Sequence, residues 1–160
     1  MLDPYFSATK ARWLLKKHKI DPNKYFFGTI DTFLVWKLTE GKSFKTDVTN
    51  ASRTSLLNID SVEWDSNLID IFELSGLNLP VVTKNTSDFG STKLFGGEIK
   101  ISGIAGDQQA SLIGQGCFST GQLKSTYGTG CFLMANTGKK RQNSSNKLLT
   151  TIAYLSLIHI

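Results

Sequence analysis

A single carboxylate, Asp107, stands between an apolar run and an expected helix, and two glutamines follow it. Two interpretations fit this pattern. An acid at a helix start can accept hydrogen bonds from the first-turn amides and act as an N-cap. An acid at the carboxyl end of a strand lies where open α/β sheets bind ligands, and there it can accept a proton. The amides of Gln108 and Gln109 could then hold a hydroxyl-bearing substrate.

The second candidate is the turn formed by Gly128, Thr129 and Gly130, which we expect between two strands. Glycines allow positive φ, so successive N–H groups can face an anion, and the threonine hydroxyl adds a donor. The same composition is also typical of a β-hairpin turn. No Lys-Ser or Lys-Thr pair follows, which excludes a Walker-type loop. A base on one lobe that faces a phosphate-binding turn on another predicts phosphoryl transfer.

The first part of the chain is expected to contain both helices and strands, and these elements must position the candidate residues. Apolar periodicity and capping residues predict helices over residues 7–19, 30–40, 66–75 and 108–113. Ser7, Thr29 and Asp65 are the expected N-caps. In the second helix one face carries an apolar stripe that we expect on the core, made of Ile30, Phe33, Leu34 and Leu38 with Lys37.

The sequence pattern changes near residues 114–121, which are rich in glycine, from mixed helix and strand to strands alone. Before them we expect strands over residues 54–59 and 99–104. After them we expect a β-meander over residues 123–127, 131–135 and 147–153, with Leu123, Ser125 and Tyr127 sharing one face. We therefore predict an α/β protein in two parts, residues 1–116 and 117–160.

Composition excludes several other classes of protein. The net charge is +5, but its basic residues gather at 16–19 and 139–141 without alternating aromatics, which favours solvated faces over nucleic-acid binding. No apolar run approaches the roughly 18–20 residues needed to span a bilayer, so we expect no membrane insertion. The two cysteines have no metal or redox spacing. We expect a cytoplasmic protein with no metal ligands of its own.

Five segments together resemble the FGGY family of carbohydrate kinases. They are LDPYFSATK at residues 2–10, GTIDTFLVWKL at 28–38, TDVTNASRT at 46–54, SGIAGDQQA at 102–110 and STYGTGCF at 125–132. The resemblance covers residues 1 to about 153 and is closest to the members that phosphorylate glycerol. It implies an actin-like, ribonuclease H-like fold of two domains that close over ATP and Mg²⁺, here incomplete.

The resemblance also implies roles for individual residues. Asp107 would be the general base that takes the proton from the attacking hydroxyl of glycerol. Tyr5, Gln108 and Phe132 would contact glycerol. The nucleotide phosphates would be bound at the turn of Gly128, Thr129 and Gly130. A homo-oligomer, either a dimer or a tetramer, is implied as well.

The chain lacks other parts of the family pattern, and residues 154–160 depart from it. We therefore expect the 160 residues alone to lack kinase activity. Two alternatives stay open at this point. One is a family member that acts on a pentulose or a similar sugar, and the other is a non-catalytic actin-like nucleotide-binding module. We expect Arg53 to form a structural ion pair, and Trp13, Trp36 and Trp64 to pack in the core.

Overall fold

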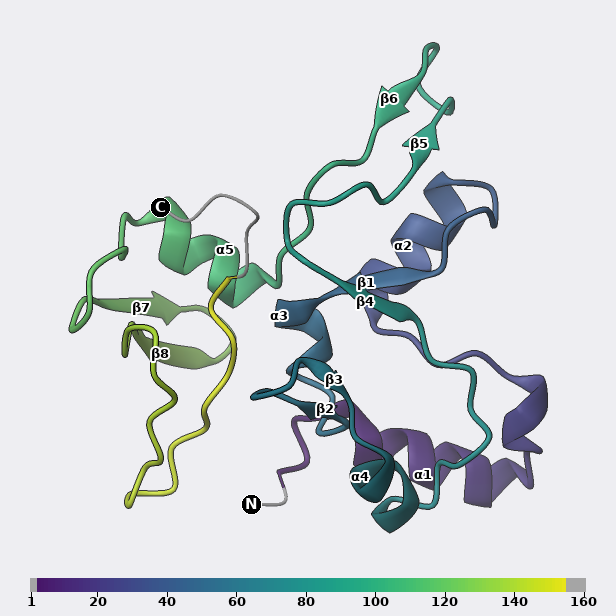
Figure 1. The fold of residues 1–160 in the computed structure, drawn as a ribbon, viewed down its shortest axis with the longest axis horizontal. Coiled ribbons are helices and arrows are strands. Elements are labelled where there is room, and N and C mark those ends of the chain that lie inside the picture. Colours follow the sequence, from purple (N-terminus) through teal and green to yellow (C-terminus); the bar gives the residue numbers. More distant parts are fainter. Residues whose placement is uncertain (1–2, 155–160) are drawn as a thin grey trace.

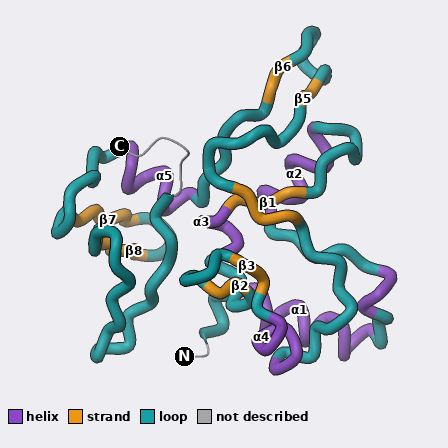
Figure 2. The backbone as a smooth tube through the Cα atoms, viewed as in Figure 1, coloured by secondary structure: helices purple, strands orange, loops and turns teal. Residues whose placement is uncertain are grey.

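The computed structural model describes residues 3–154 (Figures 1 and 2). Its helices are α1 (Ser7–His18), the 3₁₀ turn η1 (Pro22–Lys24), α2 (Ile30–Leu38), α3 (Val48–Ala51), α4 (Ser66–Ile71) and α5 (Asp107–Gly114). Its strands are β1 (Lys45–Asp47), β2 (Leu57–Asn58), β3 (Glu63–Trp64), β4 (Val81–Thr83), β5 (Ser91–Thr92), β6 (Ile99–Lys100), β7 (Leu123–Tyr127) and β8 (Cys131–Ala135). Of residues 154–160, which depart from the family pattern, all but Tyr154 lie outside the described residues.

The strands pair two by two rather than forming one broad sheet. β1 pairs with β4 in parallel, while β2 with β3, β5 with β6 and β7 with β8 are antiparallel. The strands that we expected over residues 54–59 and 99–104 are present only as the two-residue β2 and β6. Figure 1 shows the β5–β6 hairpin projecting away from the rest of the chain.

The hydrophobic core lies where α1 and the C-terminal end of α4 meet the β2–β3 region (Figure 1). Its buried members are Ala8, Phe27, Leu56, Phe72 and Leu74. Of two capping predictions for these helices, one is confirmed and the other is wrong. Asp65 caps α4 as expected, with its side chain accepting from the N–H groups of Asn67 and Leu68. Ser7 does not cap α1, because it is the first helical residue and Phe6 precedes it without a side-chain cap.

Helix α2 buries the face opposite to the predicted one. Ile30, Phe33 and Leu34 are at least half exposed, whereas Asp31, Thr32 and Val35 are buried. The reason is a polar contact with β1, in which the Thr46 hydroxyl donates to Asp31 Oδ2 at 2.7 Å. The tryptophan prediction is wrong for Trp13 and Trp36, which are exposed by 56% and 42%, and is confirmed for Trp64, which packs against the core.

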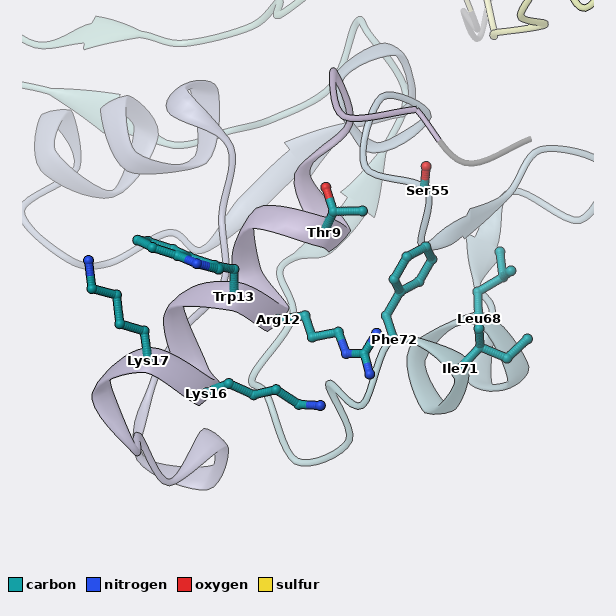
Figure 3. Close-up of a pocket in the computed structure, with 9 residues that line it drawn as sticks. All are labelled: Thr9, Arg12, Trp13, Lys16, Lys17, Ser55, Leu68, Ile71 and Phe72. Atoms are coloured by element: carbon teal, nitrogen blue, oxygen red, sulfur yellow. The ribbon is translucent and has the colours of Figure 1, made fainter.

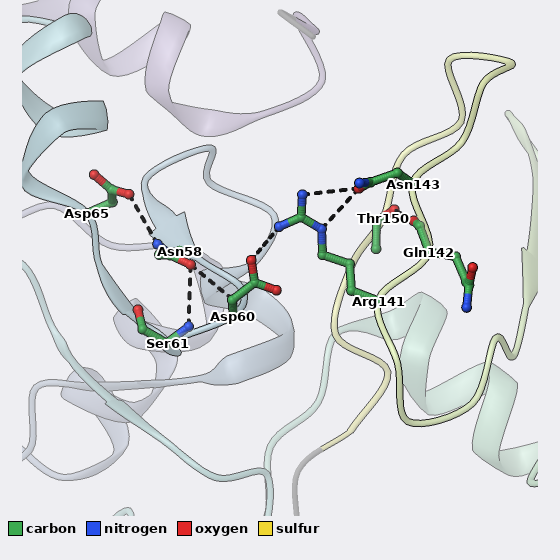
Figure 4. A network of polar contacts seen from close by, with 8 residues as sticks. All are labelled: Asn58, Asp60, Ser61, Asp65, Arg141, Gln142, Asn143 and Thr150. Atoms are coloured by element: carbon green, nitrogen blue, oxygen red, sulfur yellow. Dashed lines mark hydrogen bonds and ion pairs between the residues drawn. The ribbon is translucent and has the colours of Figure 1, made fainter.

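The C-terminal part consists of α5, the β7–β8 hairpin and a long loop (Figures 1 and 2). The third strand that we expected over residues 147–153 is absent from this described segment, which has no regular structure. The loop instead reaches back to the β2–β3 turn. There Arg141 forms an ion pair with Asp60, and its guanidinium also donates to the side chain of Asn143 (Figure 4).

No helix within residues 3–154 combines the length and the apolarity that crossing a membrane requires.

Candidate functional site

Asp107 is an exposed carboxylate at the first position of α5. The N-cap is Gly106, so the interpretation of Asp107 as an N-cap is wrong. Its Oδ1 accepts from the N–H of Gln108 at 2.8 Å, and its Oδ2 accepts from Gln108 Nε2 at 3.3 Å. A carboxylate has about four acceptor positions, so two are left for a substrate proton. The positive end of the α5 dipole stabilises its negative charge.

A buried polar network holds the backbone that leads into Asp107. Its centre is Asp47, at the end of β1, which is 0% exposed. The Asp47 carboxylate caps α3 by accepting from the N–H groups of Thr49 and Asn50, and it also accepts from Asn85 Nδ2 at 2.7 Å. Burial raises the pKa of this carboxyl above its ordinary value of 3.8, while the hydrogen bonds from Thr49 and Asn50 lower it in part.

The same network reaches the residue just before Asp107. The Thr49 hydroxyl accepts from the N–H of Gly106 at 2.7 Å, and Asn85 donates to the carbonyl of Ile104 at 3.0 Å. A Cβ on Gly106 would lie 2.7 Å from Gln109 Oε1, so the side chain of Gln109 would have to move to admit it. The start of α5 is therefore fixed by contacts from α3 and from the loop after β4.

Helix α5 packs against the β7–β8 hairpin. The face of β7 that is buried is not the one that carries its apolar residues. Leu123 and Tyr127 are exposed by 60% and 82%, whereas Lys124 is 2% exposed. The Lys124 ammonium donates to Gln108 Oε1 at 2.5 Å and to the Thr126 hydroxyl at 2.8 Å. Polar contacts with α5, rather than apolar burial, therefore orient β7.

The turn from Gly128 to Gly130 joins β7 to β8 and is exposed. Neither glycine has a positive φ, so that part of our argument is wrong. Gly130 instead is tightly placed, because a Cβ on it would lie 3.2 Å from the ring of Phe132. The N–H of Gly128 donates to the carbonyl of Gly130 at 3.1 Å. Within the described chain, the N–H groups of Thr129 and Gly130 donate to no protein group and stay available to a ligand.

Tyr5 and Phe132, which are far apart in the sequence, lie side by side. Their ring centroids are 6.0 Å apart, and Phe132 is the cross-strand partner of Thr126. The guanidinium of Arg53 lies over the rings of Tyr5 and Phe6, at 4.9 Å and 4.6 Å from their centroids. Arg53 takes part in none of the ion pairs found among residues 3–154, so the predicted pair is wrong and a cation–π contact replaces it.

These contacts connect most of the predicted site residues. Asp107 contacts Gln108, and Gln108 contacts Lys124. Lys124 bonds Thr126, which stands opposite Phe132 on β8 and just before the glycine turn. Phe132 in turn contacts Tyr5. The carboxylate, the amide and the aromatic pair are thus linked by side-chain contacts on either side of the β7–β8 pairing, and the turn follows β7 in the same hairpin.

A cavity of about 1000 Å³ lies elsewhere, between α1 and α4 (Figure 3). Arg12, Trp13 and Lys16 line it from α1, and Ile71 lines it from α4. Both Arg12 and Lys16 form ion pairs with Glu73, which lower the pKa of that carboxyl below 4.5. None of the predicted site residues lines this cavity. The chemistry of the site therefore does not belong to it.

Nearly the whole chain is similar to known proteins. Residues 1–114 match the N-terminal domain of the FGGY family of carbohydrate kinases. The chain is 56% identical over 161 residues to a glycerol kinase of Sinorhizobium fredii, which covers 96% of this chain and 32% of that protein. It is 53% identical to a glycerol kinase of Gluconobacter oxydans, with 96% and 31% covered. The chain belongs to the FGGY family of carbohydrate kinases.

Solved structures agree with this family assignment. A crystal structure of Plasmodium falciparum glycerol kinase with ADP superposes with a TM-score of 0.86 at 43% identity, over 95% of this chain and 32% of that one. A ligand-bound xylulose kinase from Lactobacillus acidophilus shares the fold alone, with a TM-score of 0.68 at 23% identity over 79% of this chain and 27% of that one. The predicted actin-like, ribonuclease H-like α/β fold class is confirmed for an FGGY chain that spans about a third of its curated relatives.

Two residues of this FGGY chain belong to the site region although sequence reasoning missed them. Asp47 carried a usable signal, since an Asp followed by a short polar run is a typical helix start. Lys124 carried none, because a lysine in an alternating strand is expected to face water. The division at residues 116 and 117 stays a prediction.

Proposed function

We propose that this chain forms part of an ATP-dependent kinase that phosphorylates glycerol, with Asp107 as the general base. The observation that carries the proposal is the connected set from Asp107 through Gln108 and Lys124 to Phe132 and Tyr5. It supports a site in which a carboxylate and two aromatic rings face the same small substrate. The glycerol kinases among the similar proteins favour glycerol as that substrate.

Each residue in the proposed site has a chemical task. The rings of Tyr5 and Phe132 would pack on the carbon skeleton of glycerol, and the Gln108 amide would orient its hydroxyls. The Asp107 carboxylate would accept the proton of the attacking hydroxyl as the new bond to phosphorus forms. Phosphoryl transfer depends mainly on positioning and on charge stabilisation, so no covalent intermediate with the protein is needed.

The glycine turn would meet the nucleotide. The free N–H groups of Thr129 and Gly130, together with the Thr129 hydroxyl, are suited to phosphate oxygens. The ADP in the Plasmodium falciparum structure supports a nucleotide ligand for this family. We infer that ATP binds here, with its phosphates toward Asp107.

Mg²⁺ is compatible with the donor set. Residues 3–154 contain no group of three or more His, Cys, Asp or Glu side chains suited to a metal. Mg²⁺ usually binds through one or two carboxylates, phosphates and water, so Asp107 and the ATP phosphates would hold it. When bound, it would neutralise charge on the phosphate oxygens. A cytoplasmic homo-oligomer, dimer or tetramer, stays part of the same prediction.

The decisive experiment replaces Asp107 in a full-length kinase that carries this sequence. We expect Asp107→Asn to lower kcat by about 10²–10⁴-fold, because the proton acceptor is lost, and to leave ADP binding measured without Mg²⁺ unchanged. Glu63→Gln is the matched control, since Glu63 is exposed and bonds no other side chain in the described residues. A kcat within about threefold of wild type would refute the base.

Two further measurements separate the alternatives. Turnover of glycerol well above that of xylulose is expected, and the reverse preference would favour a pentulose kinase. ATP binding without any turnover in the full-length enzyme would favour a non-catalytic module. The 160-residue chain alone is expected to be inactive, since the match covers 32% of the first relative.

A further inference from the structure

Lys124 is a buried cation without a carboxylate partner. It is 2% exposed, and none of the ion pairs found within residues 3–154 includes it. A buried ammonium is costly unless hydrogen bonds compensate for the lost water. Its two partners are neutral oxygens, Gln108 Oε1 at 2.5 Å and Thr126 Oγ1 at 2.8 Å. We therefore expect the buried ammonium of Lys124 to serve by orienting its hydrogen-bond partners.

The side chain that Lys124 orients is the amide of Gln108. An ammonium can only donate, so the amide must turn its oxygen toward Lys124. The nitrogen of the amide then faces the other way, where Nε2 donates to Asp107 Oδ2 at 3.3 Å. Without the cation, the amide could flip and present its oxygen to the carboxylate, which would be repulsive. The ammonium therefore selects the one amide orientation that supports Asp107.

The contact also joins two segments that pack on each other. Gln108 belongs to α5, and Lys124 belongs to β7, which leads directly into the glycine turn. Between α5 and β7, the Lys124–Gln108 bond is a charge-assisted contact, and bonds of this kind are roughly twice as strong as neutral ones. Its loss would loosen both the amide and the approach of the hairpin to α5.

We propose that Lys124 is a positioning residue of the kinase site, acting through Gln108 on the carboxylate of Asp107. The proposal rests on the proposed role of Asp107 as the base. Lys124 itself touches neither Asp107 nor the aromatic pair in any contact that the structure contains between described residues. Of its two partners, only Gln108 contacts Asp107, so we expect its effect on the base to pass through the amide, and that makes a specific test possible.

The test is a double-mutant cycle in the full-length kinase. Lys124→Met removes the ammonium and keeps an apolar stem of similar length, and Gln108→Met removes the amide. We expect each single variant to lower kcat by about 10–100-fold, the range for a lost charge-assisted hydrogen bond, with the KM for ATP within about twofold. The double variant should be no slower than the slower single variant, because both changes break the same relay.

Several results would overturn the proposal. Losses that multiply in the double variant would mean that Lys124 acts independently of Gln108. An unchanged kcat in Lys124→Met would mean that the ammonium orients nothing that matters. Lys139→Met, at an exposed lysine in the loop after β8, is the matched control and should keep wild-type kcat.

Two additions keep the result interpretable. If Lys124→Met does not fold, Lys124→Gln takes its place with the same expected and contrary outcomes, because an amide can both donate and accept and so no longer selects one orientation of Gln108. Asp107→Asn is measured alongside. Turnover retained in Asp107→Asn would reject the proposed base itself, whereas turnover lost there but kept in Lys124→Met would reject only the positioning role.

Discussion

Two carboxylates in this chain each connect distant segments, but they do so in opposite ways. Asp47 is fully buried and receives neutral donors from α3 and from Asn85. Glu73 is exposed and pairs with two cations of α1, Arg12 and Lys16. Burial raises the pKa of the first, and the two cations lower the pKa of the second.

This difference between the buried and the exposed carboxylate indicates which contacts hold the candidate site in place. Exposed ion pairs contribute little to stability, since water and salt screen them and two long side chains must be ordered. A buried acceptor that loses its donors, by contrast, leaves groups that water cannot reach. The backbone before Asp107 is bonded by the Asp47 network and not by Glu73. The buried region should therefore govern both folding and catalysis.

The largest expected effect comes from removing the buried acceptor. Asp47→Ala strands the donors of Thr49, Asn50 and Asn85, at about 1–3 kcal/mol for each unsatisfied group. We expect the free energy of unfolding, measured by urea titration, to fall by about 3 kcal/mol or more. Glu63→Ala, at an exposed acid, is the control. A loss in Asp47→Ala no larger than in this control would show that the network is not structural.

The second effect tests how tightly the same region is packed. Gly106→Ala places a Cβ 2.7 Å from Gln109 Oε1, whereas a Cβ on Gly128 would meet nothing within 4 Å. Gln109 is buried and its amide donates to Thr151 and Ile152, so moving it should be costly. We expect Gly106→Ala to lower the free energy of unfolding by about 1–3 kcal/mol, and Gly128→Ala to change it by less than about 0.5 kcal/mol. Urea titrations of the two variants make the comparison, and equal losses would contradict it.

Much of the candidate site could be predicted from the sequence, because its chemistry is local. Asp107 next to Gln108 and the turn around Thr129 stand out by residue type and spacing, although each pattern also fits a bland alternative, a helix cap or a hairpin turn, and the family resemblance is what implied their roles. Asp65 was predicted as a cap for the same reason, and the structure confirms it. Each of these features depends on a few neighbouring residues.

The rest depended on contacts that no local pattern encodes. The face of α2 that is buried was predicted wrongly because a polar contact, Thr46 with Asp31, orients that helix. Likewise, Lys124 faces inward, where Gln108, 16 residues away in the chain, accepts a hydrogen bond from its ammonium. The association of Tyr5 with Phe132 joins the start of the described segment to β8. In each case tertiary packing overrides the local periodicity.

The smallest expected effect is on the pH dependence of stability, to which Asp47 and Glu73 should contribute with opposite signs. Because the pKa of Asp47 is raised above 3.8 on folding, the native state holds a proton that the unfolded chain releases. Its contribution is therefore fullest below pH 3.8 and decreases as pH rises through the raised pKa. Because the pKa of Glu73 is lowered from 4.5, its contribution is full above pH 4.5 and is lost as pH falls through the lowered pKa.

Urea titrations of wild type, Asp47→Asn and Glu73→Gln between about pH 3 and pH 7 measure both trends. The stability advantage of wild type over Asp47→Asn should shrink as pH rises, while its advantage over Glu73→Gln should grow. The Glu73 trend should also weaken in about 1 M NaCl, where the Debye length is roughly 3 Å, whereas the Asp47 trend should persist. If both trends had the same sign, or if salt removed the Asp47 trend, the distinction between a buried acceptor and a surface ion pair would fail.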